Sequence, residues 1–348
     1  QFSGLGDPDL GDLSKEDAEA AMAVISRRND TSIDEAEAET DEETRYYGSK
    51  YWKPTVRPPR PIIQATIADL RGKLDKIYEE TQPRNTRTEA YPENSNGTTA
   101  ILLLTDLHFG NRTNQFNTQI ASERIKGIPT KLAPFLPRDL EEIIVCLGGD
   151  IVEGEEIYAT QQYNLEVTLI YQIDAAVEAI WSMLINLQST TGVKLRIVTS
   201  PGNHGRMSKT AHESTNWDNV VYSHIGVLLK MHNSGMLSGH INYNDFVSFP
   251  IRDKVGLMNH WGVKHLGTPS TQKRAAGWNH IFNSDILVHG HYHKFSVETI
   301  FGKPVVANGS LVGADDLATR MGECDPPRQV FFFCKNNQPF YGFSFLEW

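Results

Sequence analysis

Five short motifs of metal-binding residue types follow apolar runs in this chain. The runs are AILLLT, EIIVCL, LRIVTS, KVGLM and DILV, and each is typical of a buried β-strand. Carboxylate, amide and imidazole side chains at the ends of several strands can converge on one point and hold two cations. The motifs are Asp106-Leu107-His108, Gly148-Gly149-Asp150, Gly202-Asn203-His204, Asn259-His260 and Gly290-His291-Tyr292-His293.

Strand-like and helix-like segments alternate from residue 99 onward. An α/β first half followed by a strand-rich second half predicts two stacked mixed β-sheets flanked by helices, a four-layer α-β-β-α sandwich with an extended N-terminal region. We expect strands at 100–105, 142–147, 195–199, 241–251, 254–260, 285–289, 295–301, 304–308 and 329–345, helices at 162–188 and 215–233, and a long polar loop between the first two strands.

The formal charge of −10 is concentrated at the start of the chain. Residues 1–45 contain 14 acidic and 4 basic residues, so the remainder is neutral. A charge block of this kind predicts a solvated, mobile tail. The functional alternative is an acidic arm that binds a partner, or that masks a basic site by mimicking nucleic acid.

Residues 46–98 connect this tail to the main domain. Segment 46–60, YYGSKYWKPTVRPPR, has four bases, four aromatics, three prolines and no acid. It predicts an extended strap, which either packs its aromatics on the main domain or stacks them on nucleic-acid bases. Residues 62–80 repeat apolar residues at helical spacing and predict an amphipathic helix, and 82–98 is a linker. The catalytic domain is expected over 99–348.

Composition sets further limits. Residues 99–348 hold 20 bases and 23 acids, so their composition shows no strongly basic face and argues against high-affinity duplex binding, although it leaves room for a local basic patch. No apolar run is long enough to span a bilayer, and membrane contact is not expected. Cys146, Cys324 and Cys334 do not indicate a disulfide framework, so the cytoplasm is the expected location. The sequence does not decide the oligomeric state.

The motifs differ in the chemistry they can contribute. Asp106 and His108 are two residues apart on an extended chain, so their side chains point to the same side and can hold one cation. Asp150 follows two glycines that allow close backbone approach, and its two oxygens suit it to bridge two metals. Asn203 offers an amide oxygen, whereas His204 is suited to protonate a leaving oxygen.

The order D-x-H, GGD, GNH, H and GHxH resembles the calcineurin-like metallophosphoesterase superfamily over roughly residues 100–312. The resemblance implies a two-sheet sandwich with outer helices, in agreement with the fold expected above, and a phosphoesterase activity that depends on two metal ions. Carried over by position, it implies one ion held by Asp106, His108, Asp150 and His293, and a second held by Asp150, Asn203, His260 and His291. His204 would lie near the leaving group.

Three stretches resemble a narrower branch of this superfamily. GGDIVEGEE, PGNHGR, and GHYH followed by ANGSLVGADDLA, resemble metallophosphoesterases encoded by bacteriophages and prophages. Such an origin would place the protein in the cytoplasm of a host cell.

One position departs from the superfamily pattern. An acid usually follows the GNH histidine and helps to orient it, but here the residue is Gly205. Glu153, three residues after Asp150, stands where the phosphatase branch has an acid that pairs with this histidine. It is either the replacement for the missing acid or an ordinary residue of a surface loop. Arg206 can fork onto a substrate phosphate and is the third catalytic candidate beside His204 and Glu153.

The expected reaction is metal-assisted hydrolysis of a phosphoester. Two metals about 3.5–4 Å apart would hold a bridging hydroxide that attacks phosphorus in line, with His204 as general acid. Manganese is the expected metal, while iron, zinc and mixed divalent or trivalent pairs also suit these ligands. The viral-like motifs and the strap favour a phosphodiesterase acting on DNA, RNA or a nucleotide. The alternatives are a phosphomonoesterase or protein phosphatase, and a binding or scaffold protein with an idle metal site.

Overall fold

The computed structural model describes residues 97–158, 161–212, 214–262, 268–313 and 325–348. This part of the chain contains every predicted site residue. The predicted tail at 1–45, the strap, the amphipathic helix and nearly all of the linker within 46–98 lie outside the described residues, as does Cys324.

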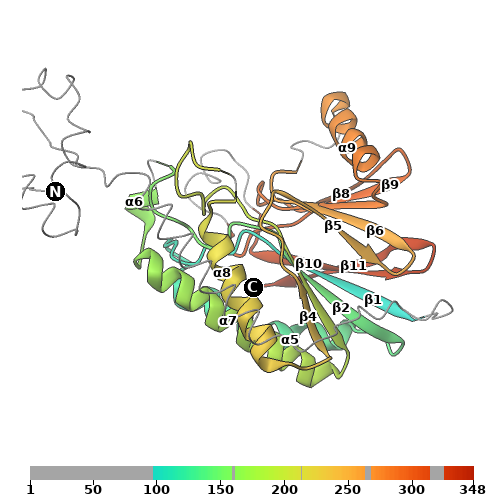
Figure 1. Ribbon diagram of the computed structural model, residues 1–348, viewed down its shortest axis with the longest axis horizontal. Helices are drawn as coiled ribbons and strands as arrows, with labels where there is room; N and C mark the ends of the chain where they lie inside the picture. Colours follow the sequence, from blue (N-terminus) through green and yellow to red (C-terminus); the bar gives the residue numbers. More distant parts are fainter. Residues whose placement is uncertain (1–96, 159–160, 213, 263–267, 314–324) are drawn as a thin grey trace, which may run out of the picture. The chain divides into compact units, whose positions relative to one another are not determined.

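The larger of two mixed β-sheets has six strands in the order β11-β10-β1-β2-β3-β4 (Figure 1). Strands β1 to β4 run parallel, and β10 pairs antiparallel with both β1 and β11. The strands are Thr98–Leu104 (β1), Leu140–Leu147 (β2), Lys194–Thr199 (β3), Leu237–His240 (β4), Arg328–Lys335 (β10) and Gln338–Glu347 (β11).

The second sheet has five strands in the order β5-β6-β7-β9-β8. Strands β6, β7 and β9 are parallel, whereas the two outer strands pair antiparallel with their neighbours. The strands are Phe246–Ile251 (β5), Lys254–Asn259 (β6), Ile286–His289 (β7), Ser296–Ile300 (β8) and Lys303–Ala307 (β9).

Helices cover the outer face of each sheet. Figure 1 shows α7 and α8 against the six-stranded sheet and α9 against the five-stranded sheet. Helices α4 and α5 pack in the same apolar cluster as α7 and α8. The helices are Thr118–Lys126 (α4), Ile128–Leu132 (α5), Ala133–Phe135 (a 3-10 helix, η2), Gln161–Asn164 (α6), Leu169–Thr191 (α7), Trp217–His232 (α8) and Pro269–Ile281 (α9).

Strand β1 shows how the sequence produces these layers. Successive side chains of a strand point to opposite faces, so Ala100, Leu102 and Leu104 pack against the helices. Ile101 and Leu103 face the second sheet instead. All five are buried, and fully burying a Leu or Ile side chain contributes about 1.5–3 kcal/mol. An apolar run without polar alternation is therefore required, because both faces of the strand are covered.

The four layers confirm the predicted fold class, but several boundaries were wrong. The interval between β1 and β2 is not only a loop, because it contains α4, α5 and η2. The Asn117 side chain begins α4 by accepting a hydrogen bond from the Ile120 N–H at 2.8 Å, a local capping signal. Helix α9 was not predicted, the helix expected at 162–188 divides into α6 and α7, and the strand expected at 241–251 begins only at Phe246.

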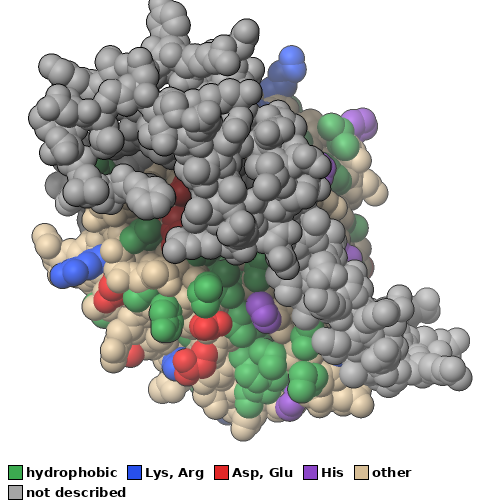
Figure 2. Space-filling model, turned by 60° about the vertical axis from the view of Figure 1, so that its left-hand side comes forward, with side chains coloured by type: hydrophobic (Ala, Val, Ile, Leu, Met, Phe, Trp, Pro, Cys, Tyr) green, Lys and Arg blue, Asp and Glu red, His purple; other side chains and the backbone are tan. Residues whose placement is uncertain are grey.

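Figure 2 shows which types of side chain lie on one face of the molecule. On this face the Lys and Arg side chains of the described residues stand apart among hydrophobic and acidic side chains. Among the described residues, none of the helices has both the length and the apolar character needed to cross a membrane.

Candidate metal centre

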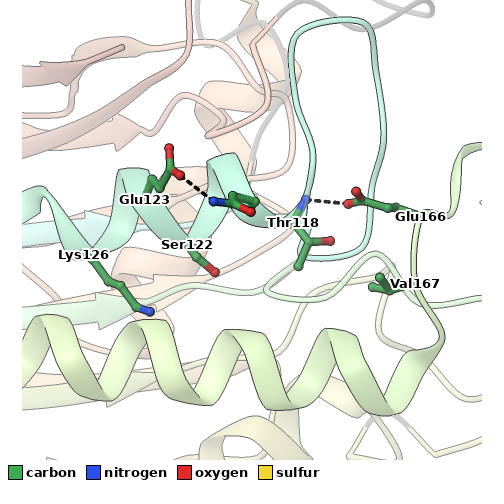
Figure 3. A pocket seen from close by; sticks show the side chains of 7 residues that line it. Thr118, Ser122, Glu123, Lys126, Glu166 and Val167 are labelled. Atoms are coloured by element: carbon green, nitrogen blue, oxygen red, sulfur yellow. Dashed lines mark hydrogen bonds between the residues drawn. The ribbon is translucent and has the colours of Figure 1, made fainter.

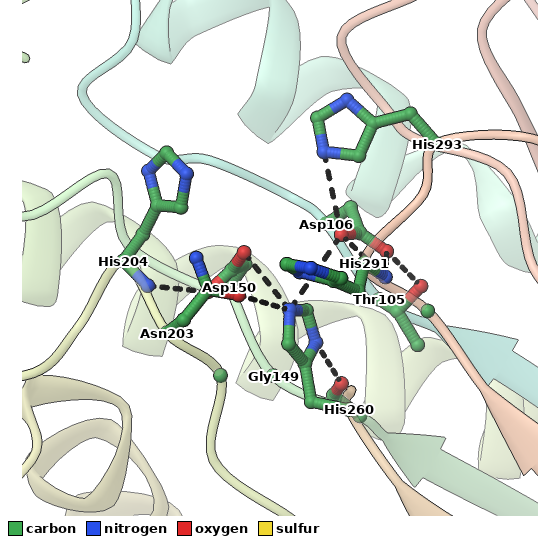
Figure 4. A network of polar contacts seen from close by, with 12 residues as sticks. Thr105, Asp106, Gly149, Asp150, Asn203, His204, His260, His291 and His293 are labelled. Atoms are coloured by element: carbon green, nitrogen blue, oxygen red, sulfur yellow. Dashed lines mark hydrogen bonds and ion pairs between the residues drawn. The ribbon is translucent and has the colours of Figure 1, made fainter. Parts of the chain in front are cut away.

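The predicted ligands lie just beyond the carboxyl ends of strands from both sheets, and they converge there (Figure 4). Parallel strands within one sheet end at the same edge, and ligand sites commonly form at such an edge. Asp106 and His108 follow β1, Asp150 follows β2, Asn203 and His204 follow β3, His260 follows β6, and His291 and His293 follow β7.

Among the described residues, three groups of three have ligand atoms that all lie within 4.8 Å of one another. Two of these groups consist of predicted ligands only, and the third is His108, Glu153 and His204. Each of the two groups of predicted ligands holds three of the four residues that the resemblance implies for one metal. The fourth residue of the second set is Asn203, whose Oδ1 lies 3.1 Å from His260 Nε2. The two groups of predicted ligands are Asp106, His108 and His293, and Asp150, His260 and His291.

The backbone at these ligands is in an uncommon conformation. Ten non-glycine residues of the described chain have positive φ, and half of them are predicted ligands. A side chain in this left-handed region costs on the order of 1–3 kcal/mol and persists only where surrounding contacts enforce it. Such strain is typical of functional sites. The five ligands with positive φ are Asp106, His108, Asp150, His291 and His293.

In the first group, two imidazole nitrogens and a carboxylate oxygen face one another. His108 Nδ1 lies 2.8 Å from Glu153 Oε2 and donates to this carboxylate, which leaves Nε2 to face the other members of the group. That Nε2 lies 3.0 Å from His293 Nε2, which in turn is 3.4 Å from Asp106 Oδ1. Two nitrogens and a carboxylate oxygen pointing at one spot need a proton or a cation between them, and the donor set suits a borderline metal ion.

The second group has the same property. His260 Nδ1 is 2.8 Å from the Gly148 carbonyl, which fixes the proton on Nδ1 and aims Nε2 at oxygens. Nε2 is 3.0 Å from Asp150 Oδ2 and 3.1 Å from Asn203 Oδ1. Burial lowers the pKa of His260, but the Asp150 and Asp106 carboxylates raise it overall to about 9. This point therefore attracts positive charge, and a metal ion fits the same oxygen and nitrogen donors.

Glu153 links a predicted ligand to the predicted general acid. Its side chain is buried, with Oε2 at 2.8 Å from His108 Nδ1 and Oε1 at 3.1 Å from His204 Nδ1. Burial lowers the pKa of His204, but the carboxylates of Asp150 and Glu153 raise it overall to about 10. Glu153 is thus not an ordinary surface loop residue, because one carboxylate orients both imidazoles.

Gly205 occupies a position with no room for the acid usual in the superfamily. A Cβ atom built on Gly205 would overlap Asn216 Oδ1, which is engaged in capping α8 by accepting from the Asp218 N–H at 2.9 Å. Glu153, in the loop after β2, contacts His204 instead. The departure seen in the sequence is therefore compensated in space.

Arg206 lies beside the site, but its side chain is held by protein groups. Its Nε donates to the Asn203 carbonyl at 3.1 Å, and Nη2 donates to the Tyr158 hydroxyl at 3.2 Å. Its guanidinium carbon lies 5.4 Å from the centre of the Trp261 ring. Arg206 and Trp261 also line a cavity of about 300 Å³. The predicted contact of Arg206 with a substrate phosphate stays a prediction.

A second, larger cavity of about 430 Å³ lies between α4 and the segment that precedes α7 (Figure 3). Glu166 accepts from the Thr118 N–H at 2.8 Å there, so its carboxylate serves the start of α4. No predicted site residue is among its lining residues, which are Thr118, Gln119, Ser122, Glu123, Lys126, Glu166 and Val167.

Asp218 in the first turn of α8 is a functional candidate that the sequence analysis missed. Its carboxylate is fully buried, and burial together with the nearby Asp150 raises its pKa to about 6. It joins the loop after β2 to the loop after β3. It accepts backbone N–H groups from Asp150 at 2.9 Å, Ile151 at 3.0 Å, Val152 at 3.2 Å and Gly202 at 2.8 Å.

Two neighbours of Asp218, the N-cap residue of α8 and a tyrosine on α8, support the same loops. Asn216 Nδ2 donates to the Gly202 carbonyl at 2.7 Å. The Tyr222 hydroxyl accepts from the Gly149 N–H at 3.2 Å and lies 2.9 Å from the Ser200 carbonyl. In the sequence, Asn216 and Asp218 look like ordinary capping residues of a helix. No local signal reveals that their partners are loops far away in the chain.

We expect Asp218→Asn to destabilise the fold strongly. Asparagine keeps the size but replaces one acceptor oxygen by an amide that points N–H groups at backbone N–H groups. One or two buried donors would lose their acceptor, which costs about 1–3 kcal/mol each. The free energy of unfolding, measured in urea, should fall by about 2–4 kcal/mol. Asp174→Asn, on the exposed side of α7, is the matched control, and equal stability of the two variants would contradict this role.

The solved structures that are similar to this chain share little of its sequence. No protein-family model matches the chain, and no curated protein matches it. A solved structure of a novel archaeal phosphodiesterase is 14% identical with a TM-score of 0.36, over 72% of this chain and 99% of that one. A predicted phosphoesterase from Streptococcus pneumoniae TIGR4 is 10% identical with a TM-score of 0.32, over 72% and 99%. Vps29 from Entamoeba histolytica complexed with zinc is 12% identical with a TM-score of 0.32, over 71% and 98%. These values carry no information on substrate.

Proposed function

We propose that this protein is a dinuclear-metal phosphoesterase that hydrolyses phosphodiesters, with nucleic acid or nucleotide as the substrate class. The observation that supports it most is the convergence of six predicted ligands into two groups with oxygen and nitrogen donors, with the seventh, Asn203, 3.1 Å from His260 of the second group. Beside them lies a histidine that does not belong to either group, and a buried carboxylate orients it.

Each side chain of the site has its own role in the proposed hydrolysis. Two bound cations would supply Lewis acidity and a nucleophile at neutral pH. Asp106, His108, Asp150 and His293 would hold one cation, and Asp150, Asn203, His260 and His291 the other. His204 gives its Nδ1 proton to Glu153 as a hydrogen bond, so Nε2 is the atom that delivers a proton to the leaving oxygen.

The diester preference rests on the sequence. The cationic-aromatic strap at 46–60 and the motifs that resemble bacteriophage enzymes support it, and both the strap and the end of the last motif lie outside the described residues. The cavity lined by Arg206 and Trp261 would take the part of a substrate beyond the phosphate. Manganese as the metal, a bacteriophage origin and a cytoplasmic location belong to the same proposal.

A phosphomonoesterase or protein phosphatase is the second candidate. The contact of Glu153 with His204 favours it, because the phosphatase branch of the superfamily has an acid at this position. A binding protein with an idle site is the third, and it is the least supported because the complete ligand set comes together with an oriented proton donor.

The first test is manganese-dependent turnover of bis(p-nitrophenyl) phosphate beside p-nitrophenyl phosphate. We expect faster cleavage of the diester, because the proposal assigns the site to diesters. Asp150→Asn is the blank, since it removes the carboxylate shared by the two metals. Preference for the monoester would favour the phosphatase, and no turnover by a metal-loaded protein would favour the idle site.

His204→Ala tests the proton donor through the leaving group. We expect the variant to keep its metal content but to lose about 10²–10⁴-fold in kcat on a dinucleoside phosphate, whose sugar hydroxyl is a poor leaving group. The p-nitrophenolate leaving group of bis(p-nitrophenyl) phosphate needs little protonation, so kcat on this substrate should fall far less. Equal losses on both substrates would count against His204 as general acid.

A further inference from the structure

Tyr158 contacts a predicted ligand, Asn203, with its hydroxyl and lies beside the predicted general acid, His204, with its ring. It accepts a hydrogen bond from Asn203 Nδ2 at 2.9 Å. The Tyr158 ring centre is 5.0 Å from that of His204. Gln161 holds the Tyr158 main chain in place. Its Oε1 accepts a hydrogen bond from the Tyr158 N–H at 2.9 Å, and its own backbone N–H donates to the Tyr158 carbonyl at 3.0 Å.

The Tyr158 hydroxyl accepts two hydrogen bonds, so its own proton can still be donated. A tyrosine hydroxyl has two lone pairs and one proton. Asn203 Nδ2 fills one lone pair, and Arg206 Nη2 donates to the other at 3.2 Å. Both contacts are donations to the oxygen, because an amide NH₂ and a guanidinium group cannot accept. Among the described residues, no acceptor receives the remaining O–H proton of Tyr158.

The Asn203 amide has a fixed orientation that strengthens this count. Its Oδ1 faces His260 Nε2 at 3.1 Å, on the metal side, so its Nδ2 must face Tyr158. The cationic donor Arg206 also polarises the hydroxyl, since hydrogen bonds in a chain strengthen one another. Arg206 itself is held in place by the Asn203 carbonyl and the Trp261 ring.

We propose that the Tyr158 hydroxyl donates a hydrogen bond to a non-bridging phosphate oxygen of the substrate, and that Arg206 acts through Tyr158 by orienting it. The inference rests on the proposed function, because it places a phosphate beside Asn203 and His204. In this proposal Arg206 positions the Tyr158 hydroxyl and makes no direct contact with the phosphate. Hydrogen bonds to a charged oxygen are stronger than neutral ones, so one such donor has a measurable effect.

The test compares full-length Tyr158→Phe with wild type after loading with Mn²⁺. Phenylalanine keeps the ring and removes only the hydroxyl. We expect unchanged affinity for Mn²⁺ by calorimetry, about tenfold weaker binding of inorganic phosphate, and a similar loss in kcat/KM on bis(p-nitrophenyl) phosphate. Tyr163→Phe is the matched control, because this tyrosine is 88% exposed on α6. It should match wild type, and equal thermal unfolding would show that both variants fold.

Two outcomes would overturn the proposal. In one, Tyr158→Phe binds phosphate and turns over substrate as wild type does. In the other, its Mn²⁺ affinity falls and both properties recover at saturating Mn²⁺, which would mean that the hydroxyl only orients Asn203. Phosphate binding does not depend on turnover. If wild type bound phosphate without cleaving either ester, the proposed function would fail, while the phosphate affinities would still decide the role of Tyr158.

A double-mutant cycle tests the part assigned to Arg206. Arg206→Gln should weaken phosphate binding, and Tyr158→Phe combined with Arg206→Gln should be no weaker than Tyr158→Phe alone, because Arg206 acts through the hydroxyl. Additive losses would show that Arg206 meets the phosphate by itself and would overturn the positioning role.

Discussion

The charge of two fully buried carboxylates, Asp106 and Asp150, determines how the rest of the site is arranged. An isolated ionised carboxylate in a low-dielectric interior is unfavourable by on the order of tens of kcal/mol, so each needs partners. Asp106 accepts the His291 N–H at 3.0 Å, and Asp150 accepts the His204 N–H at 2.7 Å and lies 3.0 Å from His260 Nε2. These partners bring the loops of both sheets together around the two carboxylates. A pair of cations would complete the compensation, which is why we interpret the arrangement as a metal centre.

Three residues outside the ligand set hold the ligand loops to one another. Glu153 contacts imidazoles from the loops after β1 and β3, and Asp218 accepts N–H groups from the loops after β2 and β3. Tyr158 contacts the loop after β3 through Asn203 and Arg206. Because each of them makes contacts at two or more points, displacement of one loop would break hydrogen bonds to another. The strained backbone of the ligands can persist only with such support.

The sequence predicted which side chains converge here, but not the residues that hold their loops together. Strand ends and their motifs are local features, so the seven ligands could be read from short stretches, and the structure brings them together. Glu153 was named either as the replacement for the acid missing at Gly205 or as an ordinary residue of a surface loop, because it lies only three residues after Asp150. Asp218 could not be found, since its hydrogen-bond partners are 16 to 68 residues away in the chain. Helix α4 was missed although Asn117 is a good N-cap, because its polar composition is also typical of a loop.

The central claim is that the two groups of ligands hold two metal ions, and the number of ions bound per chain tests it most directly. Chelator-treated full-length protein would be titrated with Mn²⁺ in a calorimeter, and the bound metal would be counted by elemental analysis after dialysis. Our account predicts two ions per chain, close enough for their electron spins to couple in the EPR spectrum. One ion per chain, none, or two ions without spin coupling would contradict it.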